Sequence, residues 1–443
     1  MRKLWVILAI FGVISDVCYA QNERLGWFVT DKPSNELIFQ RDLQNSKVLG
    51  LEQVIKPETK GNFKNMRRLK KAADDLKSTF HLPLKENIVI SPLAIQITSL
   101  IMAEGVVDAS LFEFSKIVPF LRLAHTTEIW GKYVQKKKEG MRIKTALWGD
   151  IFNGYYEQSM KKKFDVETWS LQGKVEVINS WINEILAEKF EAEIDYREIQ
   201  ERVFVSSVAV FEDGLISSFD EKNTKRKIFH NIDGTDGVVF MMQQKIEADY
   251  YEDDVVRAVR LETRNKHNIT IVMPRENISF YKFVTNLDPR RLKPSFDKNV
   301  WVNLSLPKIE LSYQLKDMKK YYEKLGVRSI FKPSHNFAKM INYDALTNIE
   351  DVLLINKFVL ADEKKSVIEK DETKVEKMFV ANRPFIFVVN NGDFIGIFGL
   401  ADDKNVEDVL EDKINKPVVV RERKDGEPAW FEGKSGTSSV NRN

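Results

Sequence analysis

Apolar residues begin to recur at helical spacing near residue 65. One predicted helical face carries Met66, Leu69, Ala73, Leu76 and Phe80. In the segment that follows, residues 86–105, Ser91 is placed to cap a helix that starts at Pro92, where a missing N–H costs nothing, and Gly105 is placed to end it. This second helix is apolar on nearly all sides, so we expect it to be buried.

An amphipathic helix and several strands are predicted further along the chain. Residues 177–190 place Ile178, Trp181, Ile182, Ile185 and Leu186 on one stripe, which is typical of a helix lying on a sheet. Residues 203–211 are a strand by composition. The segments 353–360, 384–389 and 394–399 are apolar enough for strands that are covered on both faces.

Between the first two of these apolar strands lies a charged segment, residues 361–377. It is too charged to form a core of its own. A charged segment that joins two core strands is expected to be a surface loop, displayed for another molecule to contact.

The N-terminal residues 1–20 resemble a secretory signal. Arg2 and Lys3 supply the positive end, residues 4–14 the apolar stretch, and Cys18-Tyr-Ala20 a small-residue exit. The alternative is a membrane anchor, but the apolar stretch is much shorter than the roughly 20 residues of a spanning helix. We therefore expect a secreted, extracellular protein with no membrane span.

Composition adds few constraints. The chain has 443 residues, of which 43% are apolar and 30% charged, and this is typical of a globular protein. Its net charge of +3 is too small to indicate nucleic-acid binding. Cys18 is the single cysteine, so the mature chain would contain no disulfide and no cysteine ligand for a metal. Three sequons, at Asn268, Asn277 and Asn303, are candidate N-glycosylation sites.

No enzyme active site is apparent in the sequence. The five histidines fall in different predicted elements without the spacing of metal ligands, and neither a Gly-x-Ser-x-Gly motif nor a phosphate-binding loop is present. We therefore predict no catalytic residue, no metal site, no cofactor and no enzymatic activity. If the fold assigned below were wrong, a secreted hydrolase would be the class to test.

Several motifs occur in the order and at the positions expected for the serpins, and the chain resembles that family over roughly residues 65–402. The most specific are Asn87-Ile-Val-Ile-Ser-Pro-Leu near the start, Asp362-Glu-Lys before the charged loop and Asn382-Arg-Pro-Phe-Ile-Phe after it. Other matching segments are residues 143–149, 156–164, 177–190, 203–211, 219–224, 241–242, 268–274, 306–311, 325–327, 336–340 and 356–357.

The resemblance implies an α+β serpin fold. Such a fold has a large mixed central β-sheet, additional sheets, about eight or nine helices and an exposed loop near the C-terminus. The predicted organisation is a signal peptide (1–20), an N-terminal extension (21–64), the serpin domain (65–402) and a polar, disordered C-terminal tail (403–443). The tail does not end in an endoplasmic-reticulum retention signal, which disfavours a chaperone role.

In serpins the charged loop is the reactive-centre loop, a bait for proteases. Its residues here include Glu363, Lys364, Lys365, Ser366, Lys370, Lys374 and Lys377. In inhibitory members the cleaved loop inserts into the main sheet, which requires a flexible hinge and small side chains. Here Lys365 and Ser366 stand at the usual glycine and threonine positions, and residues 368–371 (Ile-Glu-Lys-Asp) replace a run of alanines.

These departures predict a non-inhibitory member of the family. An unpaired charge buried by insertion costs at least several kcal/mol. The loop is also about six residues shorter than in typical inhibitors, and at about 3.3 Å per residue this removes roughly 20 Å of reach. Leu215 stands where the family usually has a tryptophan. The alternative is a short-loop inhibitor of a serine or cysteine protease, cleaved after Lys370, Lys374 or Lys377.

A basic cluster is the candidate binding site for a sulfated glycan. It comprises Lys132, Lys136, Lys137, Lys138, Arg142 and Lys144, at the helix where some serpins bind heparin-like polysaccharides. Lys132 and Lys136 share a face if this segment is helical, and Lys161-Lys-Lys163 could lie nearby. The alternative is an ordinary solvated helix end, because charge runs are a weak motif. A protease or another extracellular protein is the other candidate partner.

Overall fold

The structure is a computed structural model, and it describes residues 57–118, 123–137, 139–149, 152–170, 175–194, 202–217, 219–342, 346–361 and 376–401. The predicted signal peptide, nearly all of the N-terminal extension and the C-terminal tail lie outside these residues. Eight α-helices occur in the described part of the chain. They are α3 (Pro57–Thr79), α4 (Pro92–Gly105), α5 (Asp108–Ile117), α6 (Leu123–Lys136), α7 (Gly154–Phe164), α8 (Val175–Leu186), α9 (Phe280–Thr285) and α10 (Met318–Lys324).

The strands form two mixed sheets. The five-stranded sheet has the order β10-β11-β4-β2-β3, with β10 (Ile309–Leu315), β11 (Ile349–Ala361), β4 (Val203–Gly214), β2 (Met141–Trp148) and β3 (Glu167–Trp169). The nine-stranded sheet has the order β1-β14-β13-β8-β7-β6-β9-β12, with β5 paired to β6. Its strands are β1 (Ile88–Ile90), β5 (Lys225–His230), β6 (Asp236–Glu252), β7 (Val256–Glu262), β8 (Asn268–Pro274), β9 (Asp297–Pro307), β12 (Glu376–Val380), β13 (Phe385–Val389) and β14 (Phe394–Phe398).

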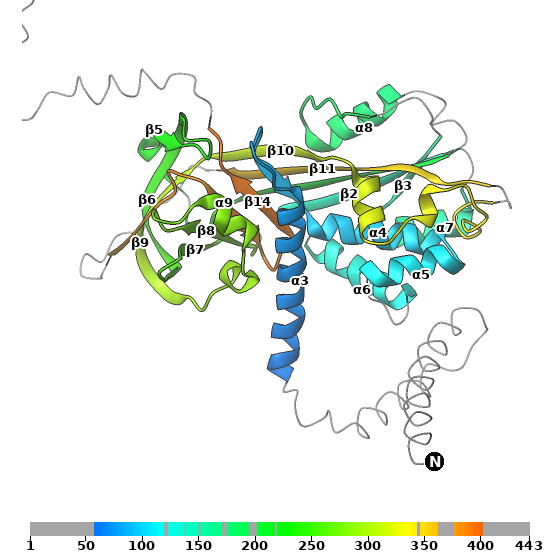
Figure 1. The fold of residues 1–443 in the computed structure, drawn as a ribbon, viewed down its shortest axis with the longest axis horizontal. Helices are drawn as coiled ribbons and strands as arrows, with labels where there is room; N and C mark the ends of the chain where they lie inside the picture. The colour runs from blue at the N-terminus through cyan, green and yellow to red at the C-terminus, as the bar shows by residue number, and fades with distance from the viewer. Residues whose placement is uncertain are drawn as a thin grey trace, which may run out of the picture.

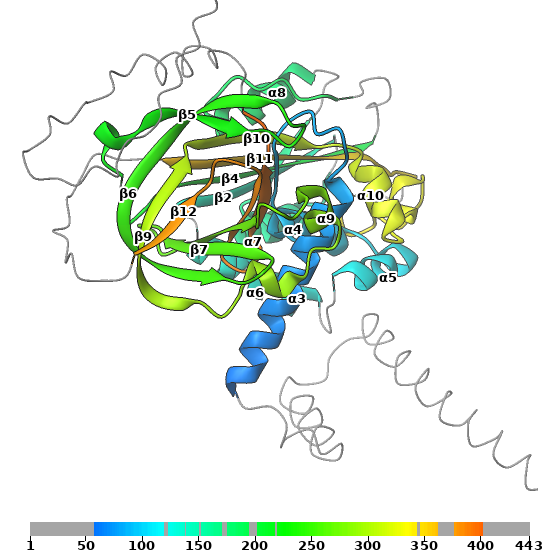
Figure 2. The ribbon, with the colours of Figure 1, turned by 60° about the vertical axis from the view of Figure 1, so that its left-hand side comes forward.

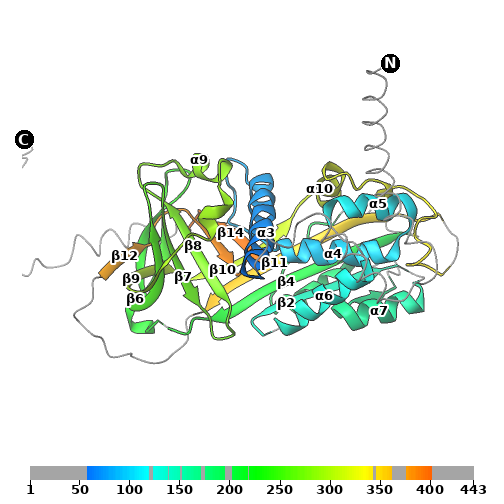
Figure 3. The ribbon, with the colours of Figure 1, turned by 90° about the horizontal axis from the view of Figure 1, so that it is seen from below.

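Helices cover both faces of the five-stranded sheet. Figure 1 shows α8 on one face and the group α4 to α7 on the other, while the curved nine-stranded sheet lies at one end of the molecule. Viewed from below, α4, α5 and α6 lie side by side across the long strands β2, β4 and β11 (Figure 3). This arrangement explains why residues on both sides of the central strands are apolar.

The local signals in the sequence predicted several elements accurately. The Ser91 hydroxyl accepts a hydrogen bond from the Ala94 N–H, and α4 runs from Pro92 to Gly105 as expected. Ile178, Trp181 and Ile182 on α8 are buried against the sheet, in a cluster that includes Trp148. Two helix bounds differ: α3 starts earlier than its apolar face, at Pro57, and α8 ends at Leu186, before Phe190.

Candidate functional site

The structure describes the two strands that flank the predicted loop, but not most of the loop itself. β11 ends at Ala361 and β12 begins at Glu376. Six of the predicted loop residues lie outside the described residues: Glu363, Lys364, Lys365, Ser366, Lys370 and Lys374. The site is therefore defined by the two strands that the loop joins and by the surfaces around them.

Lys377, the seventh predicted loop residue, lies within strand β12. It pairs in the sheet with Val302 of β9. Its ammonium group donates a hydrogen bond of 2.8 Å to Glu252 and lies 5.6 Å from the centre of the Tyr250 ring. The hydrogen bond from Lys377 is the main cause that lowers the pKa of Glu252. The loop thus ends before Lys377, and Lys370 and Lys374 are the remaining candidates for a scissile lysine.

At the other end of the loop, β11 is closed against β4. The two strands pair in parallel from Ile349↔Val203 to Ala361↔Gly214, with one irregularity between Ile349 and Val352. Successive side chains of a strand point to opposite faces. On β4 these faces contribute to two different buried clusters: Phe204, Val208 and Val210 pack below α8, whereas Val205, Ala209 and Phe211 pack into the main core.

β11 is buried in the same way and also carries two buried polar residues. The side-chain oxygen Oδ1 of Asn356 accepts a hydrogen bond of 3.0 Å from the Ser91 N–H at the start of α4. The Lys357 ammonium group donates to the Leu186 carbonyl and to Glu188, at the end of α8. These contacts tie β11 to the helices on both faces of the sheet.

Leu215, the position at which the family usually has tryptophan, directly follows β4. It is buried and forms an isolated bridge with Thr263. The smaller side chain is therefore accommodated in a packed environment at the loop end of β4.

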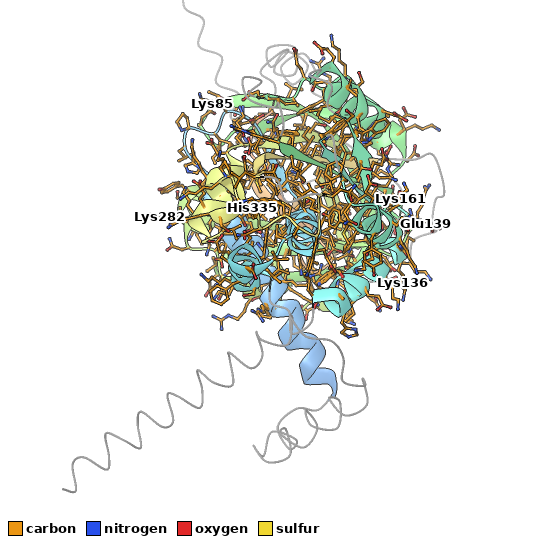
Figure 4. The ribbon with its side chains drawn as sticks, turned by 90° about the vertical axis from the view of Figure 1, so that its right-hand side faces the viewer. Lys85, Lys136, Glu139, Lys161, Lys282 and His335 are labelled. Carbon is orange, nitrogen blue, oxygen red and sulfur yellow. The ribbon has the colours of Figure 1, made fainter. Side chains whose placement is uncertain are left out.

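The predicted basic cluster lies where α6, α7 and β2 meet. α6 runs through Lys136, so Lys132 and Lys136 share a helical face as expected. The Gln135 side chain donates a hydrogen bond of 3.1 Å to the Lys162 carbonyl, which brings the C-terminal ends of α6 and α7 together. Figure 4 shows Lys136 and Lys161 on the same side of the molecule, with Glu139 close by.

Several of these cations are already paired. Lys132 donates to Glu128 at 2.7 Å, and Arg142 lies 3.9 Å from Glu212. Lys144 and Lys161 both bind Asp165, and these bonds outweigh the effect of burial and lower the Asp165 pKa.

Other members of the cluster keep their charge available. Within the described part of the chain, the side chains of Lys136, Lys137 and Lys162 make no hydrogen bond or ion pair. Lys138 lies outside the described residues. The cluster thus has fewer unpaired cationic side chains than the sequence suggests.

The three sequon asparagines differ in exposure. Asn268 and Asn277 are exposed. Asn303 is half-buried in β9, between Lys245 of β6 and Met378 of β12. A glycan is accommodated more readily at the first two positions.

A buried ionic network at Asp393 was not predicted from the sequence. Asp393 lies in the turn between β13 and β14 and is fully buried, yet it binds Arg68 of α3 and accepts a 2.7 Å hydrogen bond from Tyr133 of α6. Its backbone carbonyl accepts from the Ser91 hydroxyl. Burial and the Asp393 charge raise the pKa of Tyr133. Because the partners are hundreds of residues apart in the sequence, no spacing signal could reveal them.

The described residues contain no cluster of side chains suited to hold a metal ion. They also contain no helix that is both long and apolar enough to cross a membrane.

Comparison with known proteins identifies the fold. The family model described as "Serpin (serine protease inhibitor)" matches residues 70–397. The chain belongs to the serpin family. Serpins are generally protease inhibitors rather than enzymes, and their partners are proteases or other proteins.

Its relatives among curated serpins are distant. An uncharacterized serpin-like protein of Methanosarcina mazei is 22% identical over 280 residues, which are 58% of this chain and 65% of the relative. A serpin-like protein of Thermococcus kodakarensis is 24% identical over 72% of each chain, and iripin-3 of Ixodes ricinus is 25% identical over 51% of this chain and 58% of its own. The match to the first relative thus spans just under two thirds of its length.

Solved structures confirm the serpin fold. Native tengpin, a thermophilic serpin, superimposes with a TM-score of 0.64 at 20% identity, covering 76% of this chain and 93% of tengpin. Native protease nexin-1 with heparin gives 0.64 at 17% identity, and thyroxine-binding globulin with thyroxine gives 0.65 at 15% identity. Each of these two matches covers 76% of this serpin and all of the other chain.

Proposed function

We propose that this serpin is secreted and acts by binding a protein or glycan, without trapping a protease through loop insertion. The observation that carries the proposal is the burial of β4 and β11 on both faces. A strand inserted between them would direct its side chains alternately into two apolar layers. Between Val203 and Phe211 of β4 neither layer offers solvent to a charged side chain, although Glu212, at the loop end of the strand, is exposed.

The loop sequence is poorly suited to those two layers. The loop carries charged residues at both odd and even positions: Lys365, Glu369 and Asp371 are odd, and Lys370 is even. In either register of an inserted strand, some of these charges would therefore face each apolar layer. Burying one unpaired charge costs at least several kcal/mol. This cost opposes the conformational change on which a serpin trap depends.

The test is thermal unfolding before and after a protease cuts the loop between Lys364 and Lys374. We expect no large rise in Tm after the cut, because the severed loop stays outside the sheet. A matched variant carries Lys365→Gly, Glu369→Ala, Lys370→Ala and Asp371→Ala. If the charges are what prevents insertion, cutting this variant at Lys374 should raise its Tm.

Two results would overturn the proposal. One is a large rise in Tm for the cut wild-type chain. The other is a denaturant-resistant complex with a trypsin-like or papain-like protease, which would favour the short-loop inhibitor cleaved after Lys370 or Lys374.

A sulfated glycan is the second candidate partner. It is supported by the adjoining ends of α6 and α7 and by the unpaired ammonium groups of Lys136, Lys137 and Lys162. The related protease nexin-1 has been solved with heparin. Clustered ammonium groups bind sulfate chains by summed attraction that salt weakens.

Heparin chromatography at physiological salt tests this site. We expect Lys136→Glu with Lys137→Glu to elute at clearly lower salt than the wild type. The control is Lys85→Glu with Lys282→Glu, which makes the same change in charge on the opposite side of the molecule (Figure 4). Equal loss of retention in both variants would reject the α6–α7 site.

A further inference from the structure

A cavity of about 440 Å³ opens beside β12. Its walls come from β5, β7, the turn after β8, and β12 with the residues that follow it. The lining residues are His230, Arg257, Glu276, Met378, Val380, Asn382 and Arg383.

The walls of this cavity carry excess positive charge. Arg257, Arg275 and Lys377 all face one carboxylate, Glu252. Arg383 donates to Glu276 at 3.0 Å, but Glu276 itself is largely exposed. His230 is paired with Asp236. Among the lining residues, two arginines, Arg257 and Arg383, therefore face one carboxylate, Glu276.

Two of the guanidinium groups are incompletely hydrogen-bonded. The Nε–H groups of Arg257 and Arg383 are buried and have no hydrogen-bond partner. An unsatisfied buried donor is costly, more so on a charged group. These two Nε–H groups are buried, so an anionic side chain in the cavity would act on the charge of the guanidinium groups without bonding to Nε.

The cavity also has an apolar part. The Met378 side chain is 65% exposed although it belongs to a strand, and Val380 on the same strand is half-buried. β12 is the last strand in the order of the nine-stranded sheet, and Figure 2 shows it at that edge beside β9. An occupant with both acidic and apolar side chains would match these walls.

Ala401, which directly precedes the C-terminal tail, is connected to this cavity by hydrogen bonds. Ala401 donates a 2.7 Å hydrogen bond to the Asn231 side chain, which in turn donates to the Ala401 carbonyl. Asn231 follows His230, whose N–H binds the Asn382 carbonyl. His230 and Asn382 both line the cavity, so the C-terminal tail starts at its rim.

The first residues of the tail have the required chemistry. Residues 402–412 contain six acidic side chains and one lysine, with Val406, Val409 and Leu410 between them. At about 3.3 Å per extended residue, five residues reach roughly 16 Å from Ala401. We propose that residues 402–412 dock in the cavity of their own chain. Docking covers Met378 and adds negative charge beside Arg257 and Arg383, which already pair with Glu252 and Glu276. It also restrains β12, the strand into which the reactive-centre loop runs.

Cysteine trapping in the full-length chain tests this docking. In a Cys18→Ser background there is no other thiol, and Val406→Cys is combined with Met378→Cys in the cavity wall. The control pair is Val406→Cys with Phe240→Cys, because Phe240 is exposed on β6, close to where Gly237 contacts Ala401, but does not line the cavity.

Docking raises the local concentration of the two thiols, so we expect the Met378 pair to form its disulfide about tenfold faster than the Phe240 pair. The product should be a monomer, and high salt should slow its formation. Equal rates for the two pairs, or a disulfide-linked dimer, would overturn docking within one chain.

Substitutions in the tail test the role of charge without altering the folded domain. One variant removes four acidic charges near the start of the tail, with Glu407→Gln, Asp408→Asn, Glu411→Gln and Asp412→Asn. We expect disulfide formation by the Met378 pair in this variant to be as slow as that by the Phe240 pair. The matched control changes four acids further along the tail, with Glu422→Gln, Asp425→Asn, Glu427→Gln and Glu432→Gln, and should retain the fast rate. An equal reduction by both sets would contradict docking by residues 402–412.

Discussion

The loop joins two strands that are held in different ways. β11 lies between β10 and β4 in the five-stranded sheet, is buried on both faces and is fixed by apolar packing, as Phe358 stacking on Phe211 illustrates. β12 is an edge strand, with Met378 exposed and Lys377 bound to Glu252 by an ion pair at the surface. Opening the sheet at β11 would disrupt apolar packing on two faces, whereas rearranging β12 would expose one large buried side chain, Phe379, and exchange the surface contacts of Lys377 and Met378 with water.

This difference bears directly on what the serpin can do. Apolar burial on both faces resists a new charged strand at the N-terminal end of the loop. Ion pairs at moderately exposed positions are weak and depend on salt and pH. Regulation by a partner, or by the tail, is therefore easier at the C-terminal end of the loop.

The largest contrast is expected for apolar truncations in the two strands. Phe358→Ala should reduce the free energy of unfolding by about 3–5 kcal/mol, because Phe358 is fully buried and packs on Phe211 and Phe387. Met378→Ala should change it by less than about 0.5 kcal/mol. Urea denaturation measures both. Similar losses would show that β12 is packed as firmly as β11.

A polar pair gives a smaller contrast. Asn356→Ala leaves the buried Ser91 N–H without its acceptor and should cost about 1–3 kcal/mol of unfolding free energy. Asn382, after β12, is half-buried and its side chain makes no hydrogen bond within the described residues, so Asn382→Ala should cost no more than about 0.5 kcal/mol. The comparison fails if both variants unfold at the same urea concentration.

The ion pair of β12 should contribute still less. Its two side chains, Lys377 and Glu252, are 39% and 32% exposed. A double-mutant cycle of Lys377→Ala and Glu252→Ala should give a coupling free energy of about 0.2–1 kcal/mol, decreasing with added salt. A coupling above that range, or one insensitive to salt, would mean that β12 is anchored as strongly as a core strand.

The smallest effect is the dependence of stability on pH. The Lys377 hydrogen bond lowers the pKa of Glu252 in the folded chain, so the ionised form is favoured by folding. This stabilisation is present above the unfolded glutamate pKa of about 4.3 and is lost as pH falls through the folded value. Thermal unfolding from pH 6 to pH 3 should show a smaller loss of Tm for Glu252→Gln than for wild type. Parallel curves would exclude this contribution.

Local patterns in the sequence predicted much of the molecule. The Ser91 cap, the stripe of α8 and the apolar strands β4, β11, β13 and β14 follow from periodicity and composition, which depend on neighbouring residues. The order of motifs predicted the serpin family, and the family model confirmed it. The departures in the loop, such as Lys365 at the glycine position, are also read from the sequence alone.

Only the tertiary structure decided which charged residues are paired and which surfaces are open. Lys377 lies in β12, where it pairs with β9 and donates a hydrogen bond to Glu252. Lys144 is not available to bind a partner, because it forms an ion pair with Asp165. The cavity beside β12 is built from four separate parts of the chain. An ion pair or a cavity forms between residues brought together by folding, so its energy depends on distances in space that no local spacing of residues encodes.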